Sequence, residues 1–452
     1  MSGSKQVWAK NSWRCFPAKQ QPSWPSADAS DAAVARLSRL PALVSSGETR
    51  KLKNQLKEVA NGKAFVLQAG DCAETFSRCH GPYIHDLLKT ILQMAVVLAF
   101  AGEKKVVTIG RLAGQYAKPR SESTETVNGK IIANYRGDMV NSIEPTEAAR
   151  AHNPARMVEG YFCSAATLNL ARAFTKGGYA SLNYVDSWNQ ASFGQFHANP
   201  EYKKLCTDIQ KAVNFMTAIG MKPDAAELNE FNLYTSHEAL LLEYEEALTR
   251  SDTLTGDCYD TSAHLLWIGE RTRQPDGAHV EFARGISNPI GVKVGPDYCL
   301  DDIKRLIDIL NPTNEPGRLS LITRFGAKKI GNLLPPLLEA SKQEGKNIVW
   351  ICDPMHGNTY LNKNGQKTRD FSAIAEEVRL FFAAHQKAQT VAGGIHLELS
   401  GTNISECISS NCPSLACDLV SNGQSVCDPG LSAEQGIELA FTIARMLHNP
   451  TQ

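Results

Sequence analysis

The sequence predicts an α/β protein folded as a (β/α)₈ barrel, the TIM barrel, with an N-terminal extension and extra helices inserted after the second and third strands. Short runs rich in apolar and β-branched residues recur along the chain, with helical patterns between them. Eight such runs, each followed by a helix, is the count of this barrel. A doubly wound sheet is the competing α/β arrangement, but no G-x-G-x-x-G sequence follows a predicted strand.

The predicted strands follow one another at intervals that leave room for helices. They are residues 64–68, 105–110, 180–185, 265–269, 289–294, 319–324, 347–352 and 394–399. The first helix is indicated by apolar residues at helical spacing, namely Ile84, Leu87, Leu88, Ile91 and Leu92. Further helices are expected at 156–174, 276–286, 300–310, 330–341, 374–385 and 433–447. Ser432 and Gln435 have the spacing of a capping box on the last helix.

Two connections are longer than plain barrel loops require. A polar loop at 117–153 follows the second predicted strand, and two extra helices are expected after the third, near 202–219 and 237–249. We therefore expect an N-terminal extension at 1–60 and a catalytic barrel at 61–452, with inserted helices at about 197–250.

The composition argues against several classes of protein. Lys and Arg total 47 and Asp and Glu total 47, so the net charge of zero disfavours binding to nucleic acid or to an anionic membrane. The longest apolar run, 95–101, is short of the roughly 20 residues of a membrane span. The 12 cysteines are scattered without a C-x-x-C pair, which indicates a reducing compartment. The first 27 residues contain no acid, a weak likeness to a transit peptide, but we expect a cytoplasmic protein.

Polar groups that are costly to bury follow most of the predicted strands. They are Gln68, Asp71, Cys72, Arg111, Glu270, Arg271, Lys293, Arg324, Asp353, His356, His396 and Glu398, with Cys427 and Asp428 beyond the last strand. A single polar residue at the end of a strand commonly has no role beyond contact with solvent. Many at the same end of one barrel indicate a shared site, because isolated buried charges cost several kcal/mol and because barrel active sites lie at that end.

Four of these groups form a plausible metal-binding set. They are Cys72, His356, Glu398 and Asp428. One thiolate, one imidazole and two carboxylates suit a divalent transition ion, whereas a structural zinc site more often contains only Cys and His. His396 competes with His356 and Glu406 competes with Glu398, and Cys72 alone could be a buried core thiol.

The remaining strand ends and one loop supply cations. They are Arg111, Lys118, Arg120, Arg271, Lys293 and Arg324. A phosphate monoester carries about −1.5 to −2 charges at neutral pH, so this set suits two phosphates and a carboxylate. The planar guanidinium of Arg binds both kinds of anion through two hydrogen bonds. The alternative for Lys118 and Arg120 is a solvated loop.

Several uninterrupted motifs resemble one known family. LQAGDCAETF (67–76), GRLAGQYAKPRS (110–121), WIGERTRQPDGAHVEF (267–282), ICDPMHGNT (351–359) and GGIHLELSGTNISEC (393–407) closely resemble type II 3-deoxy-D-arabino-heptulosonate 7-phosphate (DAHP) synthase, and the similarity spans about 13–447. The resemblance implies condensation of phosphoenolpyruvate with erythrose 4-phosphate, the first step of the shikimate pathway to aromatic amino acids.

The resemblance also implies a role for each site residue. The metal ligands fall on Cys72, His356, Glu398 and Asp428; the phosphoenolpyruvate groups on Arg111, Glu270, Arg271, Lys293 and Arg324; and the erythrose 4-phosphate groups on Lys118, Arg120 and Ser121. Mn²⁺ is the expected ion, with Co²⁺, Zn²⁺ or Fe²⁺ as alternatives. Lys118 is the expected acid for the new alkoxide, with Lys293 as the alternative, and Glu270 would stabilise positive charge at C2.

Partners and regulation are implied less directly. The resemblance implies a homodimer or homotetramer, aromatic amino acids as possible feedback effectors, and a possible chorismate mutase partner. The chain departs from the family pattern in the 121–130 loop and at 228–236, which puts feedback regulation in doubt. Cys427 precedes Asp428, so a Cys72–Cys427 disulfide could form after metal loss.

Three other functions compete with this interpretation. The first is that of another metal-dependent barrel enzyme, such as an aldolase or an amidohydrolase. Amidohydrolase barrels bring an H-x-H sequence on the first strand, where this chain has Val66, Leu67 and Gln68. An inactive regulatory subunit would not need complete sets of metal-binding and cationic residues. The same reaction could also serve a specialised aromatic pathway.

Overall fold

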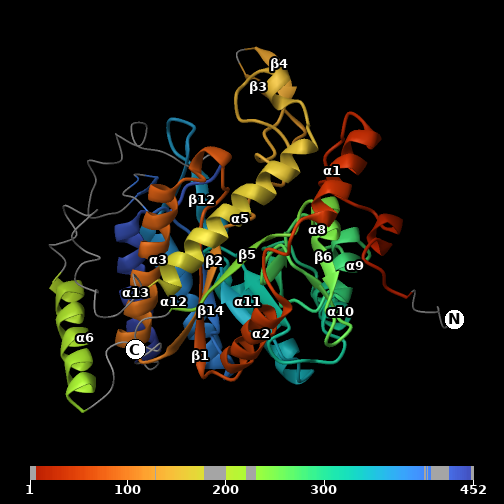
Figure 1. Cartoon of the computed structure of the whole chain (residues 1–452). Helices are drawn as coiled ribbons and strands as arrows, with labels where there is room; N and C mark the ends of the chain where they lie inside the picture. Colours follow the sequence, from red (N-terminus) through yellow and green to blue (C-terminus); the bar gives the residue numbers. More distant parts are fainter. Residues whose placement is uncertain are drawn as a thin grey trace.

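The computed structural model contains a closed barrel of eight parallel strands, which confirms the predicted fold class (Figure 1). It describes residues 7–127, 129–177, 200–219, 231–401, 404, 406–408 and 427–448. The barrel strands are β1 (Ala64–Gly70), β2 (Lys105–Arg111), β5 (Leu233–Glu238), β8 (Leu265–Ile268), β9 (Ile290–Val294), β10 (Leu319–Thr323), β11 (Val349–Cys352) and β14 (Gly394–Glu398). Around the barrel they lie in the order β1, β14, β11, β10, β9, β8, β5, β2.

The third barrel strand is β5, and this corrects the expected strand at 180–185, which lies outside the described residues. Thr108 of β2 pairs with Leu233, and Ser236 of β5 pairs with Leu265 of β8, so β5 closes the gap between β2 and β8. Its sequence, LYTSHE, is short and mixed in polarity because polar side chains at Ser236 and Glu238 face the barrel interior. That composition concealed the strand from an analysis based on apolar runs.

The position of the insertion changes with this assignment. Helix α6 (Pro200–Ala218) lies between β2 and β5, so it follows the second strand and not the third. The segment expected as an inserted helix at 237–249 contains the end of β5 and helix α8 (Leu242–Leu248). The long β2–β5 connection also holds α4 (Glu147–Arg150) and α5 (Ala155–Lys176).

The other helices cover the outside of the barrel close to their predicted positions. They are α3 (Gly81–Ala101), α9 (Ala278–Gly285), α10 (Leu300–Leu310), α11 (Ile330–Gln343), α12 (Phe371–Ala388) and α13 (Ala433–His448). The capping box on α13 is confirmed, since Gln435 N donates to Ser432 Oγ at 3.2 Å and Ser432 N donates to Gln435 Oε1 at 3.1 Å. Among the described helices, α3 alone is long and apolar enough to cross a membrane, but 72% of its apolar window is buried inside the protein.

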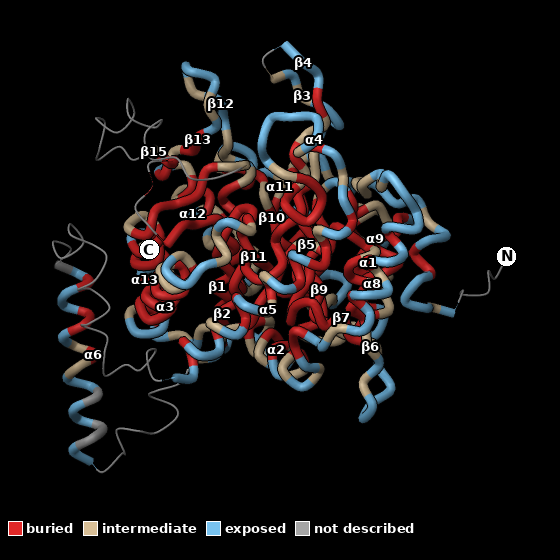
Figure 2. Tube along the Cα trace, turned by 45° about the horizontal axis from the view of Figure 1, so that its top comes forward, coloured by how far each residue is buried: buried red, intermediate tan, exposed pale blue. Residues whose placement is uncertain are grey.

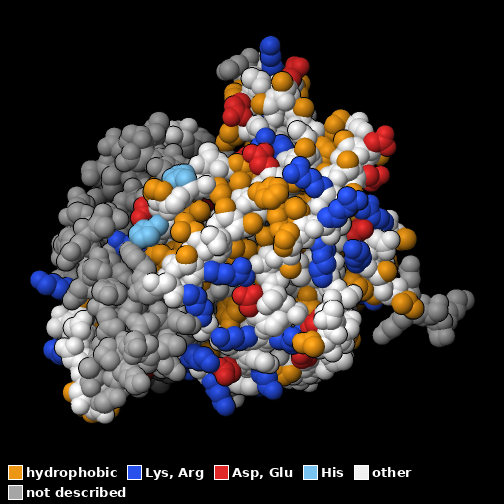
Figure 3. Space-filling model, in the orientation of Figure 1, with side chains coloured by type: hydrophobic (Ala, Val, Ile, Leu, Met, Phe, Trp, Pro, Cys, Tyr) orange, Lys and Arg blue, Asp and Glu red, His pale blue; other side chains and the backbone are white. Residues whose placement is uncertain are grey.

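Short hairpins rise at the end of the barrel where the strands terminate (Figure 1). They are β3 (Thr124–Val127) with β4 (Lys130–Ala133), and β12 (Thr359–Leu361) with β13 (Lys367–Asp370), to which β15 (Cys407–Ile408) adds in parallel. A third hairpin joins β6 (Thr249–Ser251) and β7 (Cys258–Asp260). Figure 2 shows buried chain through the barrel and exposed chain at the hairpin tips. Figure 3 shows acidic and basic side chains on the same face, as expected for a chain without net charge.

The N-terminal segment packs onto the barrel through two helices, α1 (Ala27–Arg39) and α2 (Ser46–Ala60). Helix α1 packs against α5 and α8. Helix α2 begins at a capping box, in which Glu48 N donates to Ser45 Oγ at 3.2 Å and Ser45 N donates to Glu48 Oε2 at 2.9 Å. Its buried side chains Leu52, Leu56 and Val59 form one apolar cluster with residues of the barrel strands. Because α2 leads directly into β1, this cluster closes the floor of the barrel, opposite the strand ends that carry the polar residues.

Replacing Leu56 by alanine is expected to lower the free energy of unfolding by about 2–5 kcal/mol, since a fully buried leucine would leave a cavity under the strands. Asn54→Ala, on the exposed face of the same helix, is the matched control and should change stability by less than about 0.5 kcal/mol. Chemical denaturation followed by circular dichroism measures both. Equal stability of the two variants would contradict the assigned role of α2.

Candidate active site

The pleat of the strands brings one layer of charged side chains to the mouth of the barrel. Successive strand residues point to opposite faces, so residues two apart share a side. Arg111, Glu238, Lys293 and Glu398 lie at or near the ends of β2, β5, β9 and β14. Asp353 directly follows β11. Beneath this layer the inward side chains are mostly apolar, as Val107, Ile109, Trp267 and Ile322 illustrate.

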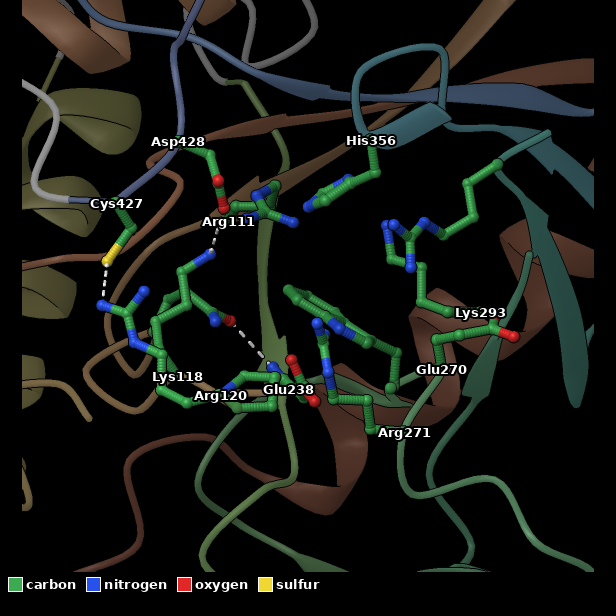
Figure 4. Close-up of a pocket in the computed structure, with 15 residues that line it drawn as sticks. Arg111, Lys118, Arg120, Glu238, Glu270, Arg271, Lys293, His356, Cys427 and Asp428 are labelled. Carbon is green, nitrogen blue, oxygen red and sulfur yellow. Dashed lines mark hydrogen bonds and ion pairs between the residues drawn. The ribbon is translucent and has the colours of Figure 1, made fainter. Parts of the chain in front are cut away.

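A pocket with about 590 Å³ of empty space lies above this layer (Figure 4). All the predicted cations line it, namely Arg111, Lys118, Arg120, Arg271, Lys293 and Arg324. Glu238, Glu270, His356, Cys427 and Asp428 also line it. The predicted phosphate-binding residues thus meet in one cavity, although they come from many separate segments of the chain.

Of the four predicted metal donors, His356 and Asp428 line this pocket, and Glu398 and Cys72 lie behind them, each in contact with one of the two. Cys72 Sγ lies 3.7 Å from Asp428 Oδ2, and His356 Nε2 lies 3.1 Å from Glu398 Oε1. Lys118 links the two pairs, with its Nζ 3.9 Å from Glu398 Oε1 and 3.8 Å from Asp428 Oδ2. Within the described ranges, no three such side chains already converge as a preformed metal site. Instead, cations lie among the carboxylates and balance their charge.

The pKa values of these donors follow from burial and from their neighbours. Burial raises the pKa of a carboxyl group, but at Glu398 the charges of His356 and Arg369 outweigh it and hold the pKa well below its usual range. At Cys72, burial and then the charge of Glu398 raise the thiol pKa well above its usual value. Glu398 is therefore an anion, and Cys72 is a neutral thiol until a cation stabilises its thiolate. This donor chemistry fits a divalent transition ion.

The structure separates the two candidate histidines. His396 is fully buried, its Nε2 contacts the guanidinium of Arg111, and its ring meets Trp267 edge-on at 5.2 Å between centroids. His396 therefore lies within the barrel, below the pocket. His356 lines the pocket and faces Glu398, so the geometry favours His356 as the metal-binding candidate.

Glu406 serves a different purpose from Glu398. Its Oε2 accepts a hydrogen bond from Gly430 N at 2.7 Å, so it supports the loop that follows Asp428. Glu398 instead contacts His356 directly. The geometry therefore favours Glu398 over Glu406 as the donor.

Lys293 is joined to the metal-binding candidates through Asp353. The Lys293 ammonium contacts the Asp353 carboxylate, whose Oδ2 lies 2.7 Å from His356 Nδ1. Burial lowers the pKa of Lys293 to about 8 despite this partner. Trp267 forms the wall between the cations, since its ring centre lies 5.7 Å from Lys293 Nζ and 5.0 Å from the Arg111 guanidinium carbon.

The loop with Lys118 and Arg120 is anchored, which argues against the solvated alternative. Lys118 is buried. Arg120 Nε donates to Tyr135 O at 2.6 Å, and its Nη2 donates to Cys427 Sγ at 3.2 Å. The side-chain amide of Gln20, in the N-terminal segment, accepts from Arg120 N at 2.9 Å and donates to Arg120 O at 3.0 Å.

The remaining predicted residues lie at the outer side of the pocket. Arg271 Nη2 donates to Ser121 Oγ at 2.8 Å, which brings Ser121 to the pocket edge. Glu270 Oε1 accepts from Arg273 Nη2 at 2.7 Å. Within the part of the chain that the structure describes, Arg324 Nε has no hydrogen-bond partner although it is buried, which suits a cation that binds a ligand anion.

Glu238 and Gln115 are polar pocket residues that the sequence patterns did not indicate. Glu238 N donates to Gln115 Oε1 at 2.9 Å, and both side chains line the pocket. Burial raises the pKa of Glu238, although Lys118 and Lys293 lower it. The position of Glu238 at the end of a barrel strand is the feature that could have indicated it. The sequence pattern instead predicts the third strand at 180–185.

The sequence matches one known family over nearly its whole length. A sequence model described as the class-II DAHP synthetase family matches residues 8–444. The chain belongs to this family. It is 47% identical over 438 residues to a phospho-2-dehydro-3-deoxyheptonate aldolase of Streptomyces coelicolor, covering 97% of each chain. It is 45% identical to the phospho-2-dehydro-3-deoxyheptonate aldolase AroG of Mycolicibacterium smegmatis, covering 96% of this chain and 93% of that one.

A solved structure of phospho-2-dehydro-3-deoxyheptonate aldolase from Francisella tularensis is a weaker match. It aligns over 95% of this chain and 98% of its own, with a TM-score of 0.45 and 14% identity. No statement about this chain rests on that structural likeness. Membership of the family rests on the sequence matches, which span nearly the whole chain.

The two cysteines of the expected oxidation site are both free thiols in this structure. Asp428 contacts Cys72 at 3.7 Å, and Cys427 precedes it in the chain, so the thiols share one side of the pocket. The Cys72–Cys427 link stays a prediction, which peptide mapping of oxidised, metal-free protein would test.

Proposed function

We propose that this protein is a metal-dependent DAHP synthase that joins phosphoenolpyruvate to erythrose 4-phosphate and releases phosphate. The observation that carries the proposal is one pocket in which six cations meet two of the candidate metal donors, His356 and Asp428, in a chain of the class-II DAHP synthetase family. Both substrates carry a phosphate, and phosphoenolpyruvate also carries a carboxylate. The cationic lining suits these anions.

Cys72, His356, Glu398 and Asp428 would hold the metal, for which Mn²⁺ is the proposed ion. When bound, a divalent ion supplies Lewis acidity toward the aldehyde oxygen of erythrose 4-phosphate. The supporting observation is the donor set, with Cys72 next to Asp428 and His356 next to Glu398. The nearby cations Lys118 and Arg111 would have to share these carboxylates with the ion.

Lys293, Arg111, Arg271 and Arg324 would bind phosphoenolpyruvate against the Trp267 wall. A new bond would form between C3 of phosphoenolpyruvate and the aldehyde carbon of the aldose. Water then adds at C2, and the C2–O bond breaks to release phosphate. Glu270 would stabilise positive charge at C2 before water adds.

Lys118 would donate the proton that the new alkoxide requires. It lies within 3.9 Å of both proposed metal-binding carboxylates, Glu398 and Asp428, so it borders the place where the aldehyde oxygen would lie. Lys293 remains the alternative acid; it pairs with Asp353, which separates it from the aldehyde position proposed for Lys118. Arg120 and Ser121, with Lys118, would hold the aldose phosphate at the outer rim.

The decisive experiment follows the loss of phosphoenolpyruvate absorbance with and without erythrose 4-phosphate, before and after chelation. We expect consumption that needs both substrates, one phosphate released per product, and recovery on adding Mn²⁺. An inactive regulatory subunit would show no turnover with any of the candidate ions. Full turnover after complete metal removal would leave the synthase activity intact and overturn the metal requirement.

The affinity for phosphoenolpyruvate should fall by up to about tenfold per pH unit as pH rises above about 8. The reason is that burial lowers the pKa of Lys293 to about 8, so the cation is present below that pH and is lost above it. The phosphate of the ligand is already a dianion there, since its second pKa is about 6. Calorimetry on chelated protein from pH 7 to 9.5 measures the slope. Lys293→Arg keeps its charge over this range, so a slope equal to that of the wild type would contradict the assignment.

Assembly and regulation remain proposals from the family resemblance. We propose a cytoplasmic homodimer or homotetramer. Light scattering would give its mass, and the same phosphoenolpyruvate assay with added phenylalanine, tyrosine or tryptophan would detect feedback. A chorismate mutase partner would change these inhibition curves when it is added.

A further inference from the structure

We infer that Arg369 is a positioning residue that orients the proposed metal donors from behind the pocket. Arg369 is fully buried on β13, in the hairpin that rises beside the barrel mouth. The sequence reasoning did not single it out. The inference rests on the metal site proposed above and identifies which residue shapes that site.

The guanidinium of Arg369 reaches three separate segments that carry proposed donors. Its Nη1 lies 2.9 Å from Glu398 Oε2, and the same nitrogen donates to the carbonyl of Pro429, the residue after Asp428. Its Nε donates to Thr359 Oγ1 at 2.8 Å. Thr359 directly follows the short 3₁₀ helix His356–Asn358. One rigid, planar cation therefore ties together the Thr359 side chain beside the His356 turn, the carboxylate of Glu398 and the loop of Asp428.

The contact with Glu398 decides which oxygen faces the pocket. Arg369 holds Oε2 at the rear, and Oε1 is left 3.1 Å from His356 Nε2 and 3.9 Å from Lys118 Nζ. Oε1 is therefore the oxygen of Glu398 that lies toward His356, the other donor proposed beside it. Arg111 Nη2 also donates to Oε1, at 3.1 Å. Of the described cations that pair with Glu398, Arg369 alone pairs with Oε2, so a carboxylate without Arg369 would lose this orientation.

The neighbouring residue on the same face of β13 makes a parallel contact. Residues two apart in a strand share a face, and Lys367 Nζ lies 2.8 Å from Asp428 Oδ1. Lys367 is half exposed, with 48% of its side chain accessible, whereas Arg369 is fully buried. Strand β13 thus presents two cations to the two proposed metal-binding carboxylates, and the buried one is unscreened by water.

Arg369→Lys tests the inference, because lysine keeps the charge and loses the planar fork that spans three partners. Loss of a residue that orients metal ligands typically costs 10–100-fold in metal affinity. We therefore expect Mn²⁺ affinity, measured by calorimetry, to weaken by roughly 10-fold or more. We also expect the visible spectrum of the Co²⁺ protein to change, because that spectrum reports ligand geometry. Arg379→Lys, at an exposed pair with Glu376 on α12, is the matched control and should bind like the wild type.

The variants test the positioning role of Arg369, and the wild-type titration tests the metal site itself. A folded Arg369→Lys protein with unchanged Mn²⁺ affinity and an unchanged Co²⁺ spectrum overturns the positioning role. Should that variant not fold, Thr359→Val decides. It removes the acceptor of Arg369 Nε, together with the weak bond from Thr359 Oγ1 to Met355 O at 3.3 Å, and leaves the charge of Arg369 in place. Unchanged affinity and spectrum there would equally overturn the inference. A wild-type protein that binds neither ion would overturn the proposed metal site itself, and the wild-type titration shows this before any variant is made.

Discussion

Lys293→Met is expected to weaken phosphoenolpyruvate binding by roughly 30-fold to several thousand-fold, which corresponds to about 2–5 kcal/mol for removing one partner of a buried charge pair. Methionine keeps the length of the side chain and removes its charge. Lys293 is only 5% exposed, and it lies between Asp353 and Trp267 at the end of β9. The ligand anion would be left without this cation in a site that water does not screen.

Two measurements separate this effect from damage elsewhere. Lys304→Met removes a lysine from an exposed pair with Glu344 on α10 and should leave binding unchanged. Because Lys293 also pairs with Asp353, which contacts His356, metal content should be measured in the same preparations. Unchanged affinity for phosphoenolpyruvate in a folded Lys293→Met protein would refute the assignment.

Cys72→Ser is expected to lower metal affinity by roughly 100-fold or more and to abolish activity at limiting metal. Loss of a residue that only orients a ligand costs up to about 100-fold, so loss of a donor should cost at least that. A serine hydroxyl does not ionise near neutral pH and cannot supply the thiolate charge. Metal analysis after gel filtration and an activity titration with Mn²⁺ measure the two effects.

The control for this substitution is Cys352→Ser. Cys352 is equally buried, but its side chain packs in the apolar cluster on the outside of β11 and not at the pocket. The Cys352→Ser substitution should lower the free energy of unfolding, because a hydroxyl replaces a thiol in an apolar environment. It should leave the metal content unchanged. Full metal occupancy in Cys72→Ser would show that the thiol is a core residue, the alternative that the sequence leaves open.

The sequence by itself determined the barrel and the chemistry at its mouth. Seven of the expected strands agree with the structure to within a few residues, because parallel strands buried on both faces appear in the sequence as short apolar runs. The inward faces of β9 and β14 were also predictable, since side chains alternate along a strand. For that reason Lys293 and Glu398 could be assigned to the interior before any contact was known.

The tertiary structure alone decided the third strand and which candidate donors lie next to one another. Strand β5 is recognisable only from its pairing with β2 and β8, because its inward residues are polar and give no apolar pattern. Alternation places both His396 and Glu398 inside the barrel, but it does not say which histidine meets the glutamate. That depends on the register of β14 against β11 and on the loop that carries His356. Arg369 reaches Glu398 from a hairpin whose position comes from packing, so no local pattern of residues could have revealed that contact.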